Sequence, residues 1–115
     1  MIAKNPCYID DADNVARRLK GESQQLKDAA LKMARLAYAF SDPFRIQIVA
    51  ILRINDSVCN CEFQSALKLS QSKASYHLKI LVDAGVVERE VRGTWSHYSI
   101  INRKNIDAIW EALCR

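Results

Sequence analysis

The stretch 70–101 constrains the fold most, because it has the pattern of a helix followed at once by a hairpin. Ser70 can cap a helix that runs to about residue 84, where Gly85 can end it as a left-handed residue. Two short β-rich runs then surround Arg92-Gly93, which is a hairpin signal. A helix that leads directly into a small hairpin has the form of a DNA-reading helix with a wing beside it.

Four more helices are expected from hydrophobic spacing and capping signals. They cover about 23–41, 43–54, 59–68 and 103–114, and a helical turn or two is expected within 10–20. Asp42-Pro43 is typical of an N-cap followed by proline at the first helical position. The sequence therefore predicts a mainly α chain of about five helices with a two-stranded wing, a winged helix-turn-helix.

Domain organisation and location follow from what the chain lacks. The 115 residues contain no repeat, low-complexity tract or Pro/Gly-rich linker, so we expect one domain over 1–115 with an N-terminal arm over about 1–20. No apolar run reaches the roughly 20 residues of a membrane-spanning helix. The N-terminal residues also lack the apolar core of a secretory signal. These features predict a cytoplasmic protein with no membrane partner.

Charge is distributed unevenly along the chain. The net charge is only +4, and aspartates cluster near the N-terminus. The stretch 71–104 instead carries a surplus of basic residues, namely Lys73, Lys79, Arg89, Arg92, Arg103 and Lys104. A basic half that contains a helix and a hairpin suits a phosphate backbone.

The first turns of the expected reading helix hold the candidate DNA contacts, since this part of such a helix reaches base edges. They are Gln71, Ser72, Lys73, Ser75, Tyr76 and Lys79. Lysines can meet phosphate or guanine, and hydroxyls can bond phosphate or base. Arg92, at the hairpin tip, is expected to reach the backbone or minor groove. Each of these residues would otherwise be an ordinary solvated polar side chain. The expected partner is double-stranded operator DNA.

The last expected helix carries an apolar stripe that favours a homodimer. Its members follow the spacing i, i+3, i+4, i+7 and include a large aromatic residue. They are Ile106, Ile109, Trp110 and Leu113.

The four cysteines are Cys7, Cys59, Cys61 and Cys114. A reducing cytoplasm disfavours disulfides, so free thiols there are usually core residues, metal ligands or redox groups. On a regular helix, residues i and i+2 point roughly 200° apart, so Cys59 and Cys61 can share a metal only at a distorted helix start. The turn residues 55–57 place them at such a start, where the helix dipole is expected to lower thiol pKa. Thiolates select soft ions, although both cysteines could also be small buried apolar residues.

Three motifs together resemble the ArsR/SmtB family of metal-sensing repressors, over nearly the whole chain. They are Ser41-Asp42-Pro43-Phe44-Arg45-Ile46, then Ser75-x-His77-Leu78-x-x-Leu81-x-x-Ala84-Gly85-Val86-Val87, and the wing from Gly93 to Tyr98-Ser99-Ile100. The resemblance implies a winged-helix repressor that binds a near-palindromic operator as a homodimer. It also implies that His77 belongs to the hydrogen-bonded scaffold of the reading helix.

Within the family, the chain is most similar to the arsenical and cadmium/lead sensors, because Cys59-x-Cys61 falls where they carry Cys-Val-Cys. Cys7 resembles the arm cysteine that supplies a further thiolate from the other subunit, although Ala3 and Gln64 stand where these branches have more cysteines. The implied set is Cys7, Cys59 and Cys61, which suits As(III), Sb(III), Pb(II) or, with an added ligand, Cd(II). Segment 102–115 has no histidine, which argues against the family's alternative zinc site.

The leading hypothesis is therefore a repressor that leaves its operator when a soft metal or metalloid binds these thiolates, with no organic cofactor. The alternative is a thiol-redox-responsive winged-helix repressor, in which Cys7 and either Cys59 or Cys61 form a disulfide without metal. An enzyme is not expected, because the sequence has no Gly-rich phosphate loop, no paired carboxylates in a Gly-framed pocket and no Cys-His-Asn pattern.

Overall fold

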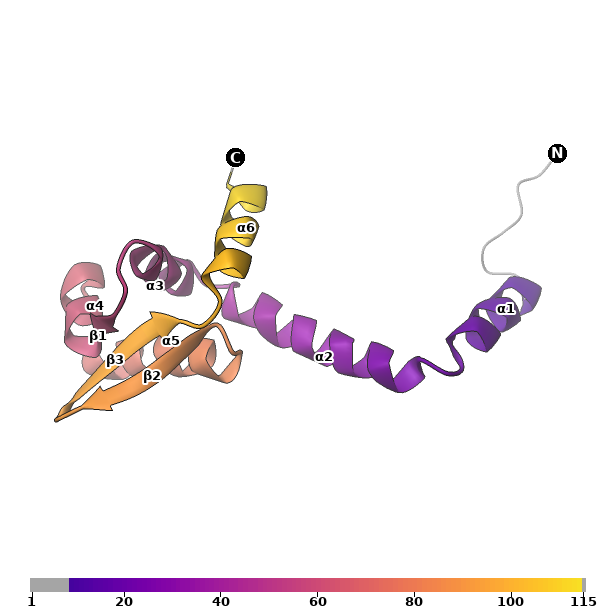
Figure 1. The fold of residues 1–115 in the computed structure, drawn as a ribbon, viewed down its shortest axis with the longest axis horizontal. Coiled ribbons are helices and arrows are strands. Elements are labelled where there is room, and N and C mark those ends of the chain that lie inside the picture. Colours follow the sequence, from indigo (N-terminus) through magenta and orange to yellow (C-terminus); the bar gives the residue numbers. More distant parts are fainter. Residues whose placement is uncertain (1–8, 115) are drawn as a thin grey trace. The chain divides into compact units, whose positions relative to one another are not determined.

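The computed structural model describes residues 9–114, and side chains from residue 13 onward. The chain divides into two compact units, Met1–Met33 and Ala34–Arg115. In the described part of the first unit, α1 (Ile9–Leu19) and the start of α2 (Ser23–Ala39) expose nearly every side chain; only Leu19 is half-buried. α1 is three turns long rather than the turn or two expected from the sequence (Figure 1).

The second unit contains the winged helix-turn-helix. After the end of α2 its elements are α3 (Pro43–Arg53), β1 (Val58–Cys59), α4 (Asn60–Leu67), α5 (Gln71–Asp83), β2 (Val87–Arg92), β3 (Trp95–Ile100) and α6 (Arg103–Leu113). The predicted fold class is confirmed, and α5 is the predicted reading helix. None of the helices in residues 9–114 is long and apolar enough to cross a membrane.

Local capping explains where the helices of the second unit begin. The Asp42 carboxylate accepts hydrogen bonds from the backbone N–H of Phe44, at 2.8 Å, and of Arg45, at 3.4 Å, while proline occupies the first helical position. The Ser70 hydroxyl accepts from the Lys73 backbone N–H at 3.2 Å and starts α5. Both caps confirm predictions made from the sequence.

The sheet has three strands in the order β1-β3-β2, all antiparallel. β2 and β3 form the wing, and Gly93 turns between them with φ of 63°, a left-handed conformation that favours glycine. The sequence predicted only these two strands. β1 has two residues, and it pairs Val58 with Tyr98 and Cys59 with His97 on the free edge of β3. So short a strand has no alternation pattern to detect.

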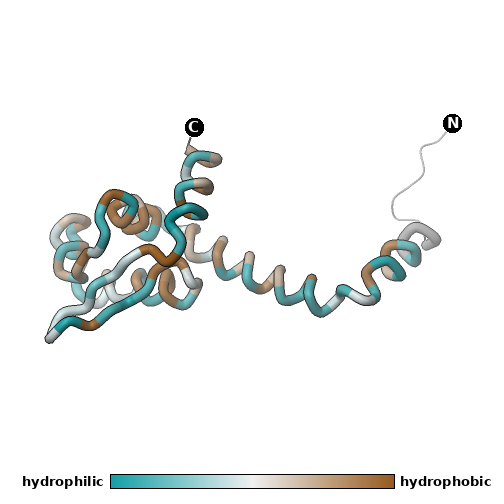
Figure 2. The backbone as a smooth tube through the Cα atoms, in the orientation of Figure 1, coloured by the Kyte–Doolittle hydropathy of each residue, from teal (hydrophilic) through white to brown (hydrophobic). Residues whose placement is uncertain are grey.

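The core lies between α3, α4, α5 and the base of the wing. Its largest fully buried side chains are Phe63, Ile48, Leu52, Leu78 and Leu81. Burying each stabilises the fold by about 1.5–3 kcal/mol relative to exposure. Figure 2 shows hydrophobic stretches along α3 and at the end of β3, whereas hydrophobic and hydrophilic positions alternate along α2. The second unit therefore contains the packed core that positions the candidate site.

Candidate thiolate site and nucleic-acid interface

Cys59 and Cys61, called here the thiol pair, lie at the junction of β1 and α4. Cys59 is the last residue of β1 and the N-cap of α4, with extended backbone angles (φ −77°, ψ 149°). Cys61 lies in the first turn of the helix. Because Cys59 is not helical, the opposed directions of i and i+2 side chains do not apply, and the two sulfur atoms lie 2.8 Å apart. This is the distorted helix start that the sequence predicted.

The two thiols differ in burial. Cys59 is only 5% exposed and is held by its strand pairing and by its backbone N–H, which donates to the Glu62 carboxylate at 2.9 Å. Cys61 is exposed to solvent, and its thiol donates to the Cys59 sulfur. One sulfur is thus fixed in the core while the other remains accessible to an incoming ion.

The pKa of the Cys61 thiol is raised, first by its hydrogen bond to Cys59 and further by partial desolvation and by the nearby charges of Cys59 and Glu62. The backbone N–H of Glu62 lowers it, but by less. The expectation that the helix start lowers thiol pKa is therefore wrong for Cys61. A neighbouring sulfur that shares the proton outweighs one backbone donor. A cation that binds here must displace that proton.

The donor set fits a soft cation only in part. Two sulfurs that face one volume supply two thiolate ligands of the kind that soft ions prefer. Within the described part of the chain, no group of three or more His, Cys, Asp or Glu side chains is placed to hold a metal. Cys7 lies outside the described residues, and Cys114 is exposed just after α6. The structure therefore supplies two of the three ligands of a trigonal thiolate site.

Six of the seven predicted DNA contacts lie on the exposed side of α5, and the seventh, Arg92, is the last residue of β2. This outer face consists of Gln71, Ser72, Lys73, Ser75, Tyr76 and Lys79, and every one of them is exposed. The inner face consists of Ala74, His77, Leu78 and Leu81, and all four are buried. The helix thus separates a packing side from a polar side that is free to meet a partner.

Several of these candidates already have partners within the chain. Lys79 forms an ion pair with Asp83 at 2.9 Å, one turn along α5. Arg92 forms an ion pair with Glu90 at 3.3 Å, and this guanidinium lowers the pKa of the Glu90 carboxyl. Both pairs are exposed, where such interactions are weak and easily exchanged for a phosphate. The charges therefore stay available to DNA.

A buried arginine fixes the inner face of α5. Arg45 is 3% exposed, and its guanidinium donates to the backbone carbonyls of Ala39, at 3.0 Å, and Tyr38, at 3.1 Å. It also lies 3.0 Å from Nδ1 of His77. Because a guanidinium only donates, Nδ1 is the accepting atom of this contact. The scaffold role that the resemblance implied for His77 is confirmed.

Tyr76 connects the surroundings of Arg45 to the outer face of α5. Its hydroxyl lies 3.4 Å from that of Tyr38, whose ring sits 5.0 Å from the Arg45 guanidinium carbon. The hydrogen bond to Tyr38 raises the pKa of Tyr76. Sequence reasoning assigned no role to Arg45, although an arginine inside an otherwise apolar helix, just after an Asp-Pro cap, was a usable signal.

A polar groove of about 430 Å³ joins Cys61 to the outer face of α5. Its lining comes from α4, α5 and the wing and includes Asn60, Cys61, Gln64, Gln71, Ser75, Lys79, Arg89 and Trp95. Across it, the Asn60 side-chain amide donates to the Ser75 hydroxyl at 3.1 Å. Cys61 therefore opens into the same hollow as three of the predicted DNA contacts. No local pattern in the sequence indicates the Asn60 contact.

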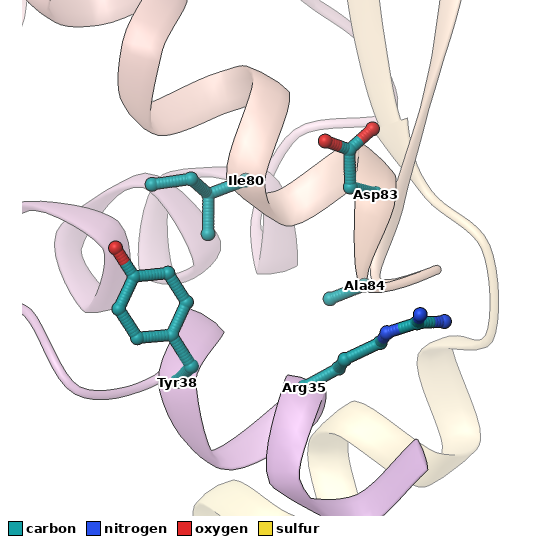
Figure 3. A pocket seen from close by; sticks show the side chains of 5 residues that line it. All are labelled: Arg35, Tyr38, Ile80, Asp83 and Ala84. Carbon is teal, nitrogen blue, oxygen red and sulfur yellow. The ribbon is translucent and has the colours of Figure 1, made fainter. Parts of the chain in front are cut away.

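A second hollow, of about 490 Å³, lies between the end of α2 and the end of α5. Figure 3 shows its lining residues, with the Arg35 and Tyr38 side chains facing Ile80, Asp83 and Ala84. It contains no thiol and none of the predicted DNA contacts. Its one carboxylate, Asp83, already pairs with Lys79. This hollow has no donor set that specifies a ligand.

The predicted dimer residues of α6 lie in different environments. Ile106 is buried in the subunit's own core, so it is not left to form an interface. Trp110 is half-buried, with its ring 4.7 Å from the Arg53 guanidinium carbon. Ile109 and Leu113 are 40% and 78% exposed and remain free.

Comparisons with known proteins agree with this architecture. The family model described as "Bacterial regulatory protein, arsR family" matches residues 42–89, which include the thiol pair and α5. An arsenical resistance operon repressor of Bacillus subtilis is 37% identical over 76 residues, which are 66% of this chain and 72% of that protein. A CadC homolog of Staphylococcus aureus, a cadmium resistance transcriptional regulatory protein, is 28% identical over 102 residues, covering 86% of this chain and 81% of the relative.

Solved structures give the same result. HlyU from Vibrio cholerae superposes with a TM-score of 0.65 at 26% identity, covering 76% of this chain and 97% of that one. The homodimeric winged helix-turn-helix DNA-binding domain Mb0332 from Mycobacterium bovis gives a TM-score of 0.67 at 25% identity, covering 76% and 83%. The resemblance found in the sequence is thereby confirmed. The chain belongs to the arsR family of bacterial regulatory proteins, and it is a winged helix-turn-helix transcriptional regulator rather than an enzyme.

Proposed function

We propose that this regulator is a repressor whose operator affinity falls when a soft metal or metalloid ion binds the thiol pair. The observation that carries the proposal is the pair itself. Its two sulfurs lie 2.8 Å apart, and Cys61 opens into a groove lined in part by the outer face of α5. The names of the relatives, which concern arsenical and cadmium resistance, support As(III), Sb(III), Cd(II) or Pb(II) as the class of inducer.

The third ligand is proposed to be Cys7, supplied by an arm over about 1–20 of a second subunit. A trigonal set of three thiolates suits this group of ions, and the thiol pair provides two of them. Cys114, just after α6, has no second thiol described beside it and is left out of the site.

DNA recognition is assigned to α5 and the wing. In a helix-turn-helix, the first turns of the second helix enter the major groove, and here they expose Gln71, Ser72, Lys73 and Ser75. Arg92, near the wing tip, would reach the adjacent backbone or minor groove. Because operator DNA is the proposed partner, we expect the protein to act in the cytoplasm.

A homodimer is proposed because a near-palindromic operator needs two reading helices about one helical turn apart. The homodimeric relative supports this assembly. On this chain, Ile109 and Leu113 of α6 are exposed apolar residues, as are Leu26 and Met33 of α2. Such surface is stable in water when a second subunit covers it.

Release then follows from linkage between two sites. If the cation lowers operator affinity by some factor, operator DNA must lower cation affinity by the same factor. A change from mostly bound to mostly free requires a few kcal/mol of differential binding, which is within the range of thiolate coordination. The proton shared by the thiol pair leaves when the cation binds.

The test is a titration with Cd(II) and with arsenite, followed by the ultraviolet thiolate-to-metal charge-transfer band. We expect saturation at one ion per subunit in wild type and loss of the band in Cys59→Ser and in Cys61→Ser. Cys7→Ser should weaken binding if the arm supplies the third ligand, and Cys114→Ser serves as the matched control. A band of wild-type size in both thiol-pair variants would refute the metal site.

A redox switch is a second candidate, because the sulfurs of Cys59 and Cys61 already lie 2.8 Å apart and Cys61 is exposed. One hydrogen peroxide would oxidise two thiols to one disulfide and be reduced to two waters. The pair can do this within one subunit, whereas the expectation from sequence used Cys7 as one partner. Peroxide-dependent loss of operator binding, with the mass reduced by two hydrogens and no metal present, would favour this candidate.

A further inference from the structure

We infer that Asn60 is a positioning residue that transmits cation binding from the thiol pair to α5 through its hydrogen bond to Ser75. This inference rests on the proposed function and specifies its regulation. Asn60 stands between the two cysteines in the chain, as the first residue of α4. Ser75 lies on the outer face of α5, among the predicted DNA contacts.

The Asn60 amide is held at both ends. Its nitrogen donates to the Ser75 hydroxyl at 3.1 Å, and its oxygen accepts from the Gln64 side-chain nitrogen at 2.8 Å. Gln64 lies one turn along α4, and its contact holds the Asn60 amide in place beside Ser75. The side chain is half-buried and therefore partly shielded from competing water. A shift of the Asn60 backbone must then either carry Ser75 with it or break the bond.

Cation binding requires the thiol pair to open, because the two sulfurs are too close together to share an ion. With bonds of about 2.3 Å, the length of a zinc–thiolate bond, and a tetrahedral angle, two thiolates on one cation stand about 3.8 Å apart. Their present separation is 2.8 Å. Cys59 is buried and paired in the sheet, so Cys61 is the residue that can move. Asn60 joins Cys59 to Cys61 in the chain, so we expect a movement of Cys61 at the first turn of α4 to reach it.

At α5, cation binding is expected to act on the Ser75 hydroxyl, which has a single hydrogen to donate. While Ser75 accepts from Asn60, its own hydrogen is left to donate to a phosphate or a base. When the Asn60 donor moves away, the hydroxyl is free to rotate and loses this orientation. The bond therefore stabilises the DNA-binding arrangement of the groove, and cation binding removes that stabilisation.

The other hydrogen bonds near the thiol pair lead elsewhere. Arg103 donates to the backbone carbonyls of Arg53 and Asn55, which ties the loop before β1 to α6. Glu62 closes the start of α4 onto Cys59. Among the hydrogen bonds of residues 9–114, the Asn60–Ser75 bond is the one that joins α4 directly to α5. Among these hydrogen bonds, the route from the thiol pair to the reading helix is therefore a single contact.

The experiment measures a coupling ratio, defined as the operator dissociation constant with saturating Cd(II) divided by the constant without it. The proteins are full-length wild type, Asn60→Ala, Ser75→Ala and the double variant. Asn105→Ala, an exposed asparagine in the first turn of α6, is the matched control. Cd(II) affinity is measured separately from the charge-transfer band, because a residue that merely stabilised the site would change it.

We expect Asn60→Ala to bind Cd(II) with wild-type stoichiometry and near wild-type affinity, while its coupling ratio falls about threefold to tenfold, the range for one hydrogen bond. Ser75→Ala should lower the ratio similarly, and the double variant should match the single ones, because both substitutions remove the same bond. Asn105→Ala should keep the wild-type ratio.

A wild-type ratio retained in both Asn60→Ala and Ser75→Ala would overturn the inference while leaving the proposed function intact. Loss of Cd(II) binding in Asn60→Ala would also overturn it, since Asn60 would then serve the site and not its coupling. A wild-type protein that binds Cd(II) with a ratio of one would instead refute the proposed function. Circular dichroism checks folding, and Ser75→Ala breaks the bond at an exposed position if Asn60→Ala fails to fold.

Discussion

The reading helix α5 is held at two places that differ in almost every physical respect. On its inner face, His77 meets the guanidinium of Arg45, which is buried and also bound to two backbone carbonyls. On its outer face, Ser75 is held by one neutral hydrogen bond from Asn60. The first contact lies in the core, whereas the second lines an open groove next to Cys61.

This difference means that the Arg45–His77 contact must stay in place, whereas the Asn60–Ser75 contact can break and re-form. A buried charge deprived of its partners leaves unsatisfied groups in the core, so the inner contact cannot be broken without damage to the fold. An outer hydrogen bond can exchange with water at small cost. A helix that must be rigid enough to read DNA and still respond to a ligand needs both kinds of contact.

The largest expected effect is on the inner contact. Arg45→Ala removes the donor to His77 and to two carbonyls, so the free energy of unfolding should fall by about 3 kcal/mol or more. Urea denaturation followed by circular dichroism measures this. Arg53→Ala, which removes an arginine that is only partly buried against Trp110, is the control and should cost about 1 kcal/mol. Equal losses of unfolding free energy in Arg45→Ala and Arg53→Ala would contradict the larger structural role assigned to Arg45.

Acidification should weaken cation binding at the thiol pair. Because the Cys61 pKa is raised, the thiol carries its proton at neutral pH, and a bound cation must displace it. Apparent cation affinity should therefore fall as pH decreases, by about tenfold per pH unit for each proton displaced. Cd(II) titrations between about pH 6 and pH 8 measure the slope. A flat profile would mean that the cation does not replace the shared proton.

Lys73→Ala tests whether the outer face of α5 meets DNA. Lys73 is exposed in the first turn, so its loss should weaken operator binding by about 1 kcal/mol and reduce the salt slope by about one. The coupling ratio should not change, because Lys73 does not contact Asn60. Fluorescence anisotropy at several salt concentrations measures both quantities. Unaltered binding would remove Lys73 from the interface.

The smallest effect is expected for the exposed ion pair of α5. Asp83→Ala removes the partner of Lys79, and both side chains are largely exposed. The free energy of unfolding should therefore change by less than about 0.5 kcal/mol. Thermal unfolding provides the measurement. A loss as large as that of Arg45→Ala would show that burial does not separate the contacts of α5 in the way described.

Much of α5 could be predicted because its signals are local. The Ser70 cap, the Gly85 stop and the spacing of Leu78 and Leu81 each depend on residues within a few positions along the chain. The same holds for the Asp42-Pro43 start of α3. Such rules operate within one helical turn, so one sequence contains all the information they need.

The Arg45–His77 and Asn60–Ser75 contacts of α5 could not be predicted, because each joins distant parts of the chain. His77 is 32 positions from Arg45, and Ser75 is 15 positions from Asn60. The direction of the Cys61 pKa shift was missed for a similar reason. The helix start was evident in the sequence, but the closeness of the Cys59 sulfur was not. Both contacts and the direction of the Cys61 pKa shift depend on how distant or adjacent residues are arranged in three dimensions.

The most direct test of the account is one titration. A fluorescent operator duplex, bound to the full-length protein, is titrated with Cd(II) or arsenite while anisotropy reports the bound fraction. The account predicts that wild type leaves the DNA as the thiols fill, while the Cys59→Ser/Cys61→Ser double variant stays bound. A wild-type complex that persists with its thiols saturated, or a double variant released at the same concentration, would contradict it.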